Sequence, residues 1–332
     1  MYNNISIQGV KGAIDLNPRL QTALGQGLIT KIIEVQKNST VDFVYQITVK
    51  IRNTVKNVYL KKYQEYPSGA WRQKKFMNFK IDPRRMSNEV KVINLLATLW
   101  GKDKVPQILY QDKKKSFIIL SDVGANGEIL SDELGKNKVH PEIGKVLGEL
   151  LGKLHGTTYG KYKKWGESKS WEKSLHWVSH LWLTQNIKKF IAPEKIELFL
   201  RQSDHVKRSL IWGDAISKNI FVKTRGGVSC IDFDYSQIYD PAYDVGTLLA
   251  YWQILEIIGN KRVKKETNKF ISDFQKAYNA TLTKHHILKI DRVAILKRAQ
   301  QWRGIKLVNL IDYVPKKHRV NAVRISKELF LR

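Results

Sequence analysis

The sequence LIWGDAISKNIFVKTRGGVSCIDFDYSQIYDPAYD, residues 210–244, decides how the rest of the chain is interpreted. Asp214 follows a short apolar run, Asn219 comes five positions later, and Asp232 lies thirteen positions beyond Asn219. Two short strand patterns around Arg225-Gly226-Gly227 predict a β-hairpin, because glycine accepts the positive φ of a tight turn. A hairpin returns its end to its start, so we expect Asp232 to lie near Asn219. Carboxylate and amide oxygens of this kind suit Mg²⁺.

The composition limits the classes of protein to which the chain can belong. It has 332 residues, 42% of them hydrophobic, which is enough for about two domains with a sizeable core. The net charge of +28, from 58 Lys+Arg and 30 Asp+Glu, favours anionic partners such as nucleotides, phosphorylated metabolites and nucleic acid. The lysines occur in short separated runs, which are typical of loops and solvated helix faces. A nucleic-acid-binding protein is therefore an alternative that we do not favour.

The chain contains one cysteine, Cys230. One cysteine excludes an internal disulfide framework and a zinc site built from cysteines, and it favours a reducing cytoplasm. The first residues lack a basic segment followed by an apolar one, and no apolar run approaches the roughly 20 residues of a membrane span. We therefore expect a cytoplasmic protein without a membrane span.

Alternating β-branched and aromatic residues predict five strands in the first third of the chain. The strand patterns are LITKIIEV, DFVYQITVKI, VKNVYLKKY, QILYQ and SFIILSDV. Between the third and the fourth, SNEVKVINLLATLW has helical spacing, with Ser87 as its N-cap and a glutamate in its first turn. The pattern predicts a small α+β lobe, an antiparallel sheet with one helix, over residues 28–121. Residues 1–27 form a leader or a capping segment.

After residue 122 the composition changes to turn residues, and helical periodicity then dominates. This predicts a larger, mainly helical lobe over residues 122–332, interrupted by the hairpin. The predicted helices cover residues 141–157, 170–190, 193–207, 241–258, 262–282, 290–311 and 315–331.

Three motifs in the second lobe carry a resemblance to a known family. The motifs WGDAISKN at 212–219, IDFDY at 231–235 and DPAYDVG at 240–246 resemble the aminoglycoside phosphotransferase and choline kinase family, relatives of protein kinases. The family places an asparagine five positions after its aspartate and a metal-binding aspartate thirteen positions later, and the spacing here agrees. The resemblance implies a bilobal protein-kinase-like fold and an enzyme that uses ATP and Mg²⁺. Such an enzyme transfers the γ-phosphoryl group to a hydroxyl of a small molecule.

The resemblance also implies roles for single residues. Asp214 corresponds to the catalytic residue that orients a hydroxyl and accepts its proton, and Asn219 and Asp232 correspond to metal ligands. Asp234 forms a D-x-D where methylthioribose kinases, which the chain resembles in part, carry D-x-E that also meets the metal. Those enzymes have serine in place of Asn219.

Other positions match residues with structural roles in the family. Asp240 and Asp244 match a D-P-x-x-D that supports the catalytic loop. Trp212 replaces the family's usual histidine at a position that packs. His155, at the end of LGELLGKLH, matches a packed and hydrogen-bonded histidine.

A protein-kinase-like fold requires a lysine on the third strand and a glutamate on the next helix, which hold the α- and β-phosphates of the nucleotide. Lys61 and Glu89 are the candidates. Lys62 is the alternative, because one register step exchanges the two faces of a strand. Spacing alone would fit a surface ion pair as well.

The remaining candidate nucleotide contacts lie in two loops. Ser39 and Thr40, between the first two strands, are candidates for covering the phosphates. Ser121 and Val123 lie in ILSDVG, where the backbone of the hinge would meet adenine.

The acceptor cannot be identified from the helical lobe. A strongly basic chain disfavours a polycationic aminoglycoside unless acidic residues cluster locally, and it leaves an anionic acceptor open. Aromatic residues near the site could enclose a choline-like cation, but core packing explains them as well. Two functions of other classes remain as alternatives: a catalytically silent nucleotide-binding regulator, and a nucleic-acid-binding protein on a kinase scaffold.

Overall fold

The computed structural model describes residues 18, 22, 24, 28–34, 42–65, 83–161, 184, 186–206 and 208–331. These residues belong to two compact units, the first within Met1–Ala97 and Val105–Ala125 and the second within Thr98–Lys104 and Asn126–Arg332. Most of the expected leader and most of the helix expected at 170–190 lie outside the described residues.

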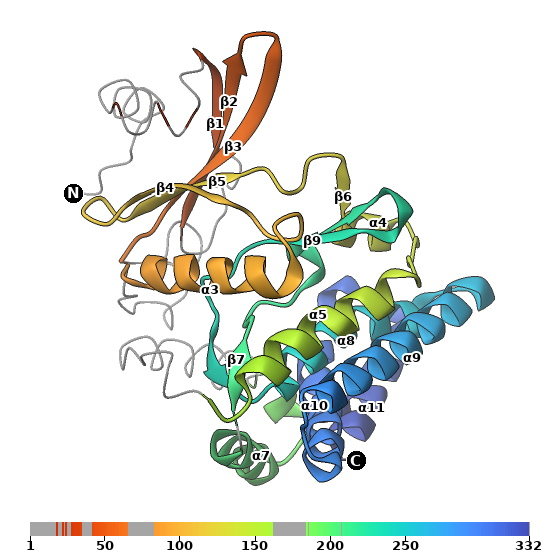
Figure 1. The fold of residues 1–332 in the computed structure, drawn as a ribbon. Helices are drawn as coiled ribbons and strands as arrows, with labels where there is room; N and C mark the ends of the chain where they lie inside the picture. The colour runs from red at the N-terminus through yellow and green to blue at the C-terminus, as the bar shows by residue number, and fades with distance from the viewer. Residues whose placement is uncertain are drawn as a thin grey trace. The chain divides into compact units, whose positions relative to one another are not determined.

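The first unit is built on an antiparallel sheet of five strands in the order β1-β2-β3-β5-β4 (Figure 1). Its strands are β1 (Leu28–Glu34), β2 (Phe43–Ile51), β3 (Thr54–Lys62), β4 (Ile108–Asp112) and β5 (Phe117–Ser121). Tyr45, Ile47 and Val49 alternate along β2 and are all buried, because side chains two apart share one face of a strand. The five predicted strands are confirmed within one or two residues at each end.

Helix α3 (Arg85–Trp100) begins two residues earlier than the sequence predicted. The reason is a turn before it, in which the amide of Met86 donates to the carbonyl of Pro83 (3.2 Å) and the amide of Ser87 to that of Arg84 (2.9 Å). The expected N-cap role of Ser87 was therefore wrong, and the first turn carries no acidic residue. Glu89 nevertheless lies on the buried face of the helix, with 1% of its surface exposed.

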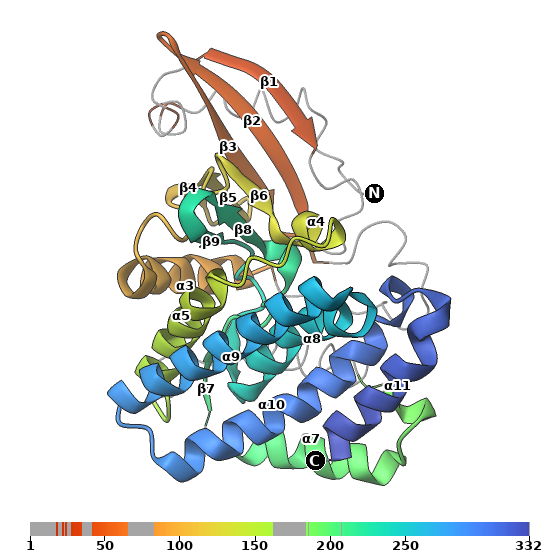
Figure 2. The ribbon, with the colours of Figure 1, turned by 90° about the vertical axis from the view of Figure 1, so that its right-hand side faces the viewer.

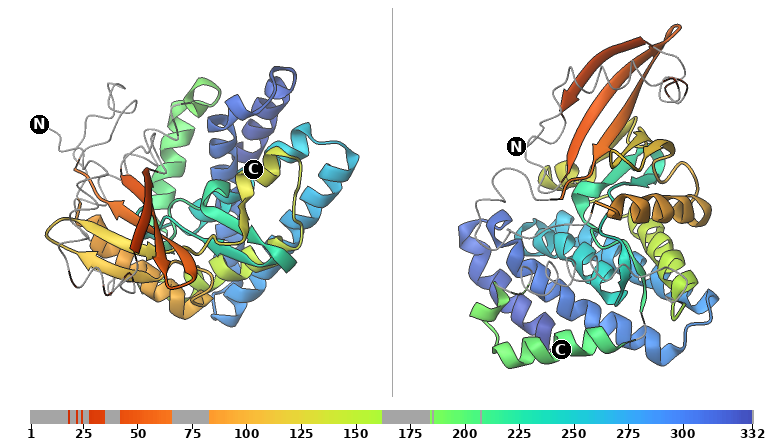
Figure 3. Two further views of the ribbon diagram at one scale, coloured as in Figure 1. Left: turned by 90° about the horizontal axis from the view of Figure 1, so that it is seen from above. Right: turned by 90° about the vertical axis from the view of Figure 1, so that its left-hand side faces the viewer.

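The second unit is mainly helical (Figure 2). Its long helices are α5 (Ile143–Thr158), α7 (Pro193–His205), α8 (Ala242–Ile258), α9 (Lys261–Lys284), α10 (Lys289–Asn309) and α11 (Lys316–Leu331). Each corresponds to a predicted helix. Phe199 of α7 contacts Trp302 of α10 and Phe330 of α11, with ring centroids 5.0 and 5.4 Å apart. The green ribbon of α7 lies beside the blue helices of the C-terminal part of the chain (Figure 3). No helix within the described parts of the chain is both long enough and apolar enough to cross a membrane.

Glycines at every fourth position of α5 allow this helix to lie close to α9. A Cβ atom on Gly144 would lie 2.6 Å from the carbonyl oxygen of Phe270, and one on Gly148 would lie 2.4 Å from that of Phe274. Both distances are too short for any side chain. The close packing of α5 on α9 sets the position of His155 in the last turn of α5.

The predicted hairpin is formed by β8 (Ile220–Lys223) and β9 (Val228–Cys230), with β6 (Gly127–Ile129) as a third strand. Its turn is a short 3₁₀ segment, and of the two glycines only Gly226 has a positive φ, of 73°. Strand β9 ends at Cys230, and Asp232, two residues later, has a φ of 64° and has left the extended conformation. A second pair, β7 (Ser209–Ile211) with β10 (Gln237–Tyr239), was not predicted.

Candidate active site

The loop after β7 carries Asp214. The preceding residue, Gly213, has a φ of +82°, and a Cβ atom there would lie 2.1 Å from the carbonyl oxygen of Tyr235. Glycine is therefore required for the chain to pass at this point. The amide of Ile216 donates to the carbonyl of Asp214 (2.8 Å) and the amide of Asn219 to that of Ile216 (3.0 Å). These bonds hold the loop from Asp214 to Asn219 in one conformation.

The side chain of Asn219 is oriented by Asp214. Its Nδ2 donates to Oδ2 of Asp214 at 2.8 Å and to the main-chain oxygen of Asp214 at 3.0 Å. Both amide hydrogens are therefore directed at Asp214. The described residues give Oδ1 of Asn219 no hydrogen bond, although Asn219 is only 7% exposed. An amide oxygen held in this way is suited to bind a cation.

The hairpin brings Asp232 to the same place. The amide of Ile231 donates to the carbonyl of Asn219 at 3.0 Å, so the two strand ends lie side by side as the sequence predicted. Asp232 adopts a left-handed conformation that is uncommon outside glycine. The indole Nε1 of Trp212 donates to the carbonyl of Asp232 at 2.9 Å, which fixes the backbone of this residue.

Two carboxylates and one amide supply oxygen atoms of the type that a hard divalent cation binds. One carboxylate oxygen of Asp232 and one of Asp234 lie within 4.8 Å of each other. Asp234 is buried and Asp232 half-buried. Mg²⁺ prefers oxygen ligands of this type and keeps other positions for phosphate and water. Asn219, Asp232 and Asp234 are thus the residues of this unit that could hold such an ion.

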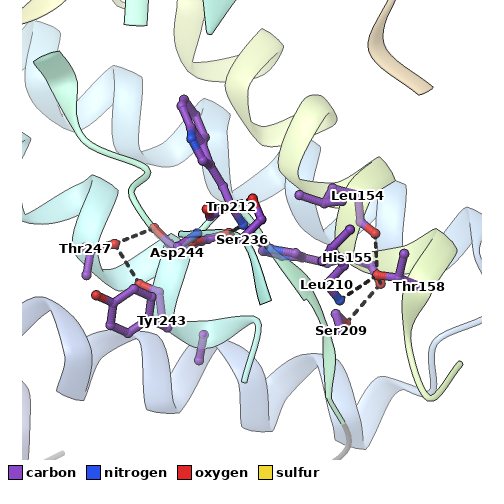
Figure 4. A network of polar contacts seen from close by, with 12 residues as sticks. Leu154, His155, Thr158, Ser209, Leu210, Trp212, Ser236, Tyr243, Asp244 and Thr247 are labelled. Carbon is purple, nitrogen blue, oxygen red and sulfur yellow. Dashed lines mark hydrogen bonds and ion pairs between the residues drawn. The ribbon is translucent and has the colours of Figure 1, made fainter. Parts of the chain in front are cut away.

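Asp244, at the start of α8, holds the backbone that leads into Asp214 (Figure 4). Its carboxylate is fully buried and accepts hydrogen bonds from the amides of Trp212 (2.6 Å) and Gly213 (2.9 Å). It also bonds Nε2 of His155 at 3.1 Å, and Nδ1 of His155 bonds the hydroxyl of Tyr278 at 2.8 Å. Asp244 and His155 therefore support the loop and do not face a substrate.

Further contacts in the same network connect α5 with β7. The hydroxyl of Ser209 donates to the carbonyl of His155 (3.1 Å), and the amide of Leu210 donates to the hydroxyl of Thr158 (2.9 Å). The hydroxyl of Ser236 donates to the carbonyl of Trp212 at 3.0 Å. The loop is thus held on both sides by side chains that are themselves buried.

Asp240 has a separate supporting role. Its fully buried carboxylate accepts two hydrogen bonds from Arg298 of α10, at 2.7 and 3.0 Å, and one from the amide of Ala242 at 3.0 Å. The bidentate pair fixes the start of α8 against α10, because two parallel bonds define an orientation.

Trp212 packs in an aromatic cluster. Its ring centroid lies 6.1 Å from that of Trp100 and 5.2 Å from that of Phe233. Only 1% of its surface is exposed. An indole at this position fills the cluster and also bonds the backbone of Asp232.

In the first unit, Lys61 and Glu89 form a buried ion pair. The distance from Nζ of Lys61 to Oε2 of Glu89 is 3.0 Å, and the two residues are 6% and 1% exposed. Lys62 is half-buried and instead donates to the carbonyl of Lys115. The structure therefore pairs Glu89 with Lys61 rather than with Lys62, and the pair is not a surface one.

Three residues around this pair were missed by sequence reasoning: Asp42, Tyr63 and Arg85. Asp42 is buried, pairs with Arg85 and lies 3.9 Å from Nζ of Lys61. The hydroxyl of Tyr63 donates to Glu89. Two acids thus balance two bases, which limits the cost of burying their charges. Asp42 is the first residue of the second strand pattern, and no sequence signal marked it as a partner of Lys61 or Arg85.

The other candidate nucleotide contacts are less informative. Ser39 and Thr40 lie outside the described residues. The hydroxyl of Ser121 accepts a hydrogen bond from the amide of Gln107 at 2.8 Å. Val123 is buried.

Two further residues that sequence reasoning missed, Tyr251 and Lys306, are influenced by the charge of Asp214. Burial raises the pKa of Tyr251 on α8, and the charge of Asp214 raises it further. Burial lowers the pKa of Lys306 on α10, while Asp214 opposes that change and Lys218 reinforces it. Tyr251 and Lys306 therefore lie within electrostatic reach of the same carboxylate. Their helices are far from Asp214 in sequence, so no motif indicates the proximity.

Comparisons with known proteins give a family and a fold. Residues 75–282 match the family model described as "Phosphotransferase enzyme family", and no curated protein sequence matches the chain. A solved structure of amicoumacin kinase hAmiN in complex with AMP-PNP, Ca2+ and Ami is similar, with a TM-score of 0.56 and 14% identity. The similarity covers 98% of this chain and 96% of that one.

Two further solved structures resemble the chain. Ethanolamine kinase from Plasmodium vivax gives a TM-score of 0.51 at 16% identity, covering 95% of this chain and 88% of that one. Macrolide 2'-phosphotransferase MphH from Brachybacterium faecium gives 0.50 at 14% identity, covering 95% and 97%. At these identities the likeness concerns the fold. It confirms the predicted class, a protein-kinase-like α+β fold with a small sheet unit and a larger helical unit.

Proposed function

Because the chain belongs to the phosphotransferase enzyme family, we propose that it transfers the γ-phosphoryl group of ATP, with Mg²⁺, to a hydroxyl of a small molecule. The observation that carries this proposal is the arrangement of Asp214, Asn219 and Asp232 in one rigid loop and hairpin. Asn219 donates to Asp214 at 2.8 Å, and its main-chain oxygen is bonded to the residue before Asp232 at 3.0 Å. This arrangement supports a proton acceptor at Asp214 next to cation ligands at Asn219 and Asp232.

Asp214 is the proposed catalytic residue. Its carboxylate orients the acceptor hydroxyl and takes its proton as the oxygen attacks phosphorus. The hydrogen bond from Asn219 and the rigid turns of the loop keep this carboxylate in place, so little reorganisation accompanies the reaction. The half-buried position of Asp214 gives a small molecule access to it.

Asn219, Asp232 and Asp234 are the proposed metal ligands. When bound, the metal neutralises phosphate charge that would otherwise repel the attacking oxygen. Tight support of the ligands is consistent with this role, because Trp212 bonds the carbonyl of Asp232 at 2.9 Å.

We propose that Lys61 of the first unit contacts the α- and β-phosphates of ATP. Glu89, 3.0 Å away, orients its ammonium, and Asp42 and Arg85 complete a charge-balanced cluster around it. The backbone at Ser121 and Val123 is proposed to meet adenine, and Ser39 and Thr40 to cover the phosphates.

A screen of a metabolite pool with ATP labelled in its γ-phosphate tests the function. We expect a labelled product with the unchanged protein and Mg²⁺, and none above background with Asp214→Ala. Asp273→Asn, a change at a partly exposed residue of α9, is the matched control and should give the same product as the unchanged protein. Nucleotide binding without transfer to any acceptor in the pool would contradict the proposal and indicate a catalytically silent regulator.

A further inference from the structure

Lys306 is a half-buried cation of α10. Among the described residues, no carboxylate lies within ion-pair distance of its ammonium. Its Nζ lies instead 6.0 Å from the ring centroid of Tyr251 on α8. The neighbours Ile305 and Leu307 are fully buried in the packing of α10 on α8, so the helix cannot rotate to expose Lys306 more fully.

Lys306 and Tyr251 lie beside each other within electrostatic reach of Asp214, the proposed catalytic residue. The carboxylate of Asp214 acts on both groups, and within the described residues it is the one acid that does so on Lys306. Lys218, exposed on the 3₁₀ turn η5 (Ser217–Asn219), adds a second positive charge. Tyr313, on η7 (Ile311–Tyr313), interacts with Tyr251 and is 63% exposed. Lys306 therefore lies beside an aromatic ring, with one carboxylate and one further ammonium within electrostatic reach.

A partly desolvated ammonium without a contacting counter-ion is costly. A bound anion would remove that cost by supplying charge-assisted hydrogen bonds.

We propose that Lys306 selects an acceptor that carries an anionic group, a phosphate or a carboxylate, together with the hydroxyl presented to Asp214. Tyr251 packs against the body of this acceptor. The inference rests on the proposed function and names its substrate class.

The transfer step balances with this acceptor. The hydroxyl oxygen forms a bond to the γ-phosphorus while the bond from that phosphorus to the bridging oxygen of ADP breaks. The hydroxyl proton passes to Asp214, and ADP leaves with the electron pair of the broken bond. The anionic group of the acceptor takes no part in the chemistry and only binds.

The test uses acceptors in matched pairs, one member with a phosphate or carboxylate and one without. Suitable pairs are glycerol with glycerol 3-phosphate, ribose with ribose 5-phosphate, and glucose with gluconate; ethanolamine and kanamycin serve as cationic acceptors. We expect transfer to anionic members with a kcat/KM about tenfold or more above that of their neutral partners.

Variants of Lys306 then locate the selectivity. Lys306→Glu should lower kcat/KM for the anionic acceptor by about tenfold to a hundredfold, mainly through KM, without a comparable change in the KM for ATP. Lys306→Arg should retain most of the preference. Lys306→Gln gives a second measurement if the glutamate variant does not fold. Lys289→Glu, the same charge reversal at an exposed position of α10, should change neither constant.

The outcomes separate the two claims. Transfer to neutral or cationic acceptors only, or an anionic acceptor whose KM is insensitive to Lys306→Glu and Lys306→Gln, would overturn the role of Lys306 and leave the phosphotransferase function standing. Nucleotide binding without transfer to any acceptor of the panel or of a metabolite pool would overturn the function itself, and the inference with it.

Discussion

Replacing Asp244 with asparagine should lower the free energy of unfolding of the second unit more than a change at its surface does. Asparagine has nearly the same shape, so the packing is kept. One carboxylate oxygen becomes an amide nitrogen, which cannot accept a hydrogen bond. The carboxylate now serves the amides of Trp212 (2.6 Å) and Gly213 (2.9 Å) and the imidazole of His155 (3.1 Å). Asp244→Asn leaves at least one buried donor without an acceptor.

The magnitude follows from those contacts. An unsatisfied buried donor costs about 1–3 kcal/mol, and a hydrogen bond to a charged group contributes about 1.5–3 kcal/mol. The site is fully buried, so water cannot replace the lost acceptor. The expected loss is roughly 3–5 kcal/mol, a large part of the about 5–15 kcal/mol that keeps a domain folded.

Urea unfolding followed by far-UV circular dichroism measures this loss, because the helices lie chiefly in the second unit. The control is Asp273→Asn, which removes a pair with Lys269 one turn away on α9 and should cost about 0.3–0.5 kcal/mol. If Asp244→Asn shifted the free energy of unfolding no more than this control, the buried network would not hold the loop as we infer.

Three other changes test separate parts of the structure. Lys61→Met leaves Glu89 buried without its base, so it should destabilise the first unit by about 3–5 kcal/mol and weaken ATP binding in calorimetry; equal losses from Lys62→Met would contradict the pairing. Gly213→Ala places a Cβ atom 2.1 Å from a carbonyl oxygen, so transfer should fall and the urea midpoint should drop; an unchanged enzyme would show that the loop adapts. Burial lowers the pKa of Lys306, with Asp214 opposing and Lys218 reinforcing this change, so its charge is lost at a lower pH than that of an ordinary lysine. The KM for an anionic acceptor should therefore rise on the alkaline side, and Lys306→Arg should move that rise to higher pH; identical profiles would contradict the assignment.

Much of the fold could be predicted because buried side chains recur at regular intervals along a strand or helix. Strand β2 alternates Tyr45, Ile47 and Val49 on its buried face, and α7 begins at a proline that suits the first turn of a helix. Strands β7 and β10 have three residues each, too few to show a period. They exist because Leu210 pairs with Ile238, a long-range contact that no local pattern records.

The candidate site likewise contains residues whose proximity could be predicted from the sequence and residues whose proximity could not. Asp214, Asn219 and Asp232 lie within one loop and hairpin, so their spacing in the sequence was enough to predict that they lie close together. The partners of Lys61 were harder to predict, because Asp42 and Arg85 are far apart in sequence and meet only in the folded unit. Lys306 and Tyr251 likewise come together through the packing of α10 on α8, which cannot be derived from periodicity.

The most direct test of the central claim measures phosphoryl transfer and nucleotide binding on the same samples of Asp214→Asn and Asp232→Asn. If Asp214 handles the acceptor hydroxyl, Asp214→Asn should lose about 10²–10⁴-fold in transfer rate and keep its affinity for Mg²⁺ with a non-hydrolysable ATP analogue. If Asp232 is a metal ligand, Asp232→Asn should lose that affinity as well. Transfer at the unchanged rate in Asp214→Asn would contradict the account.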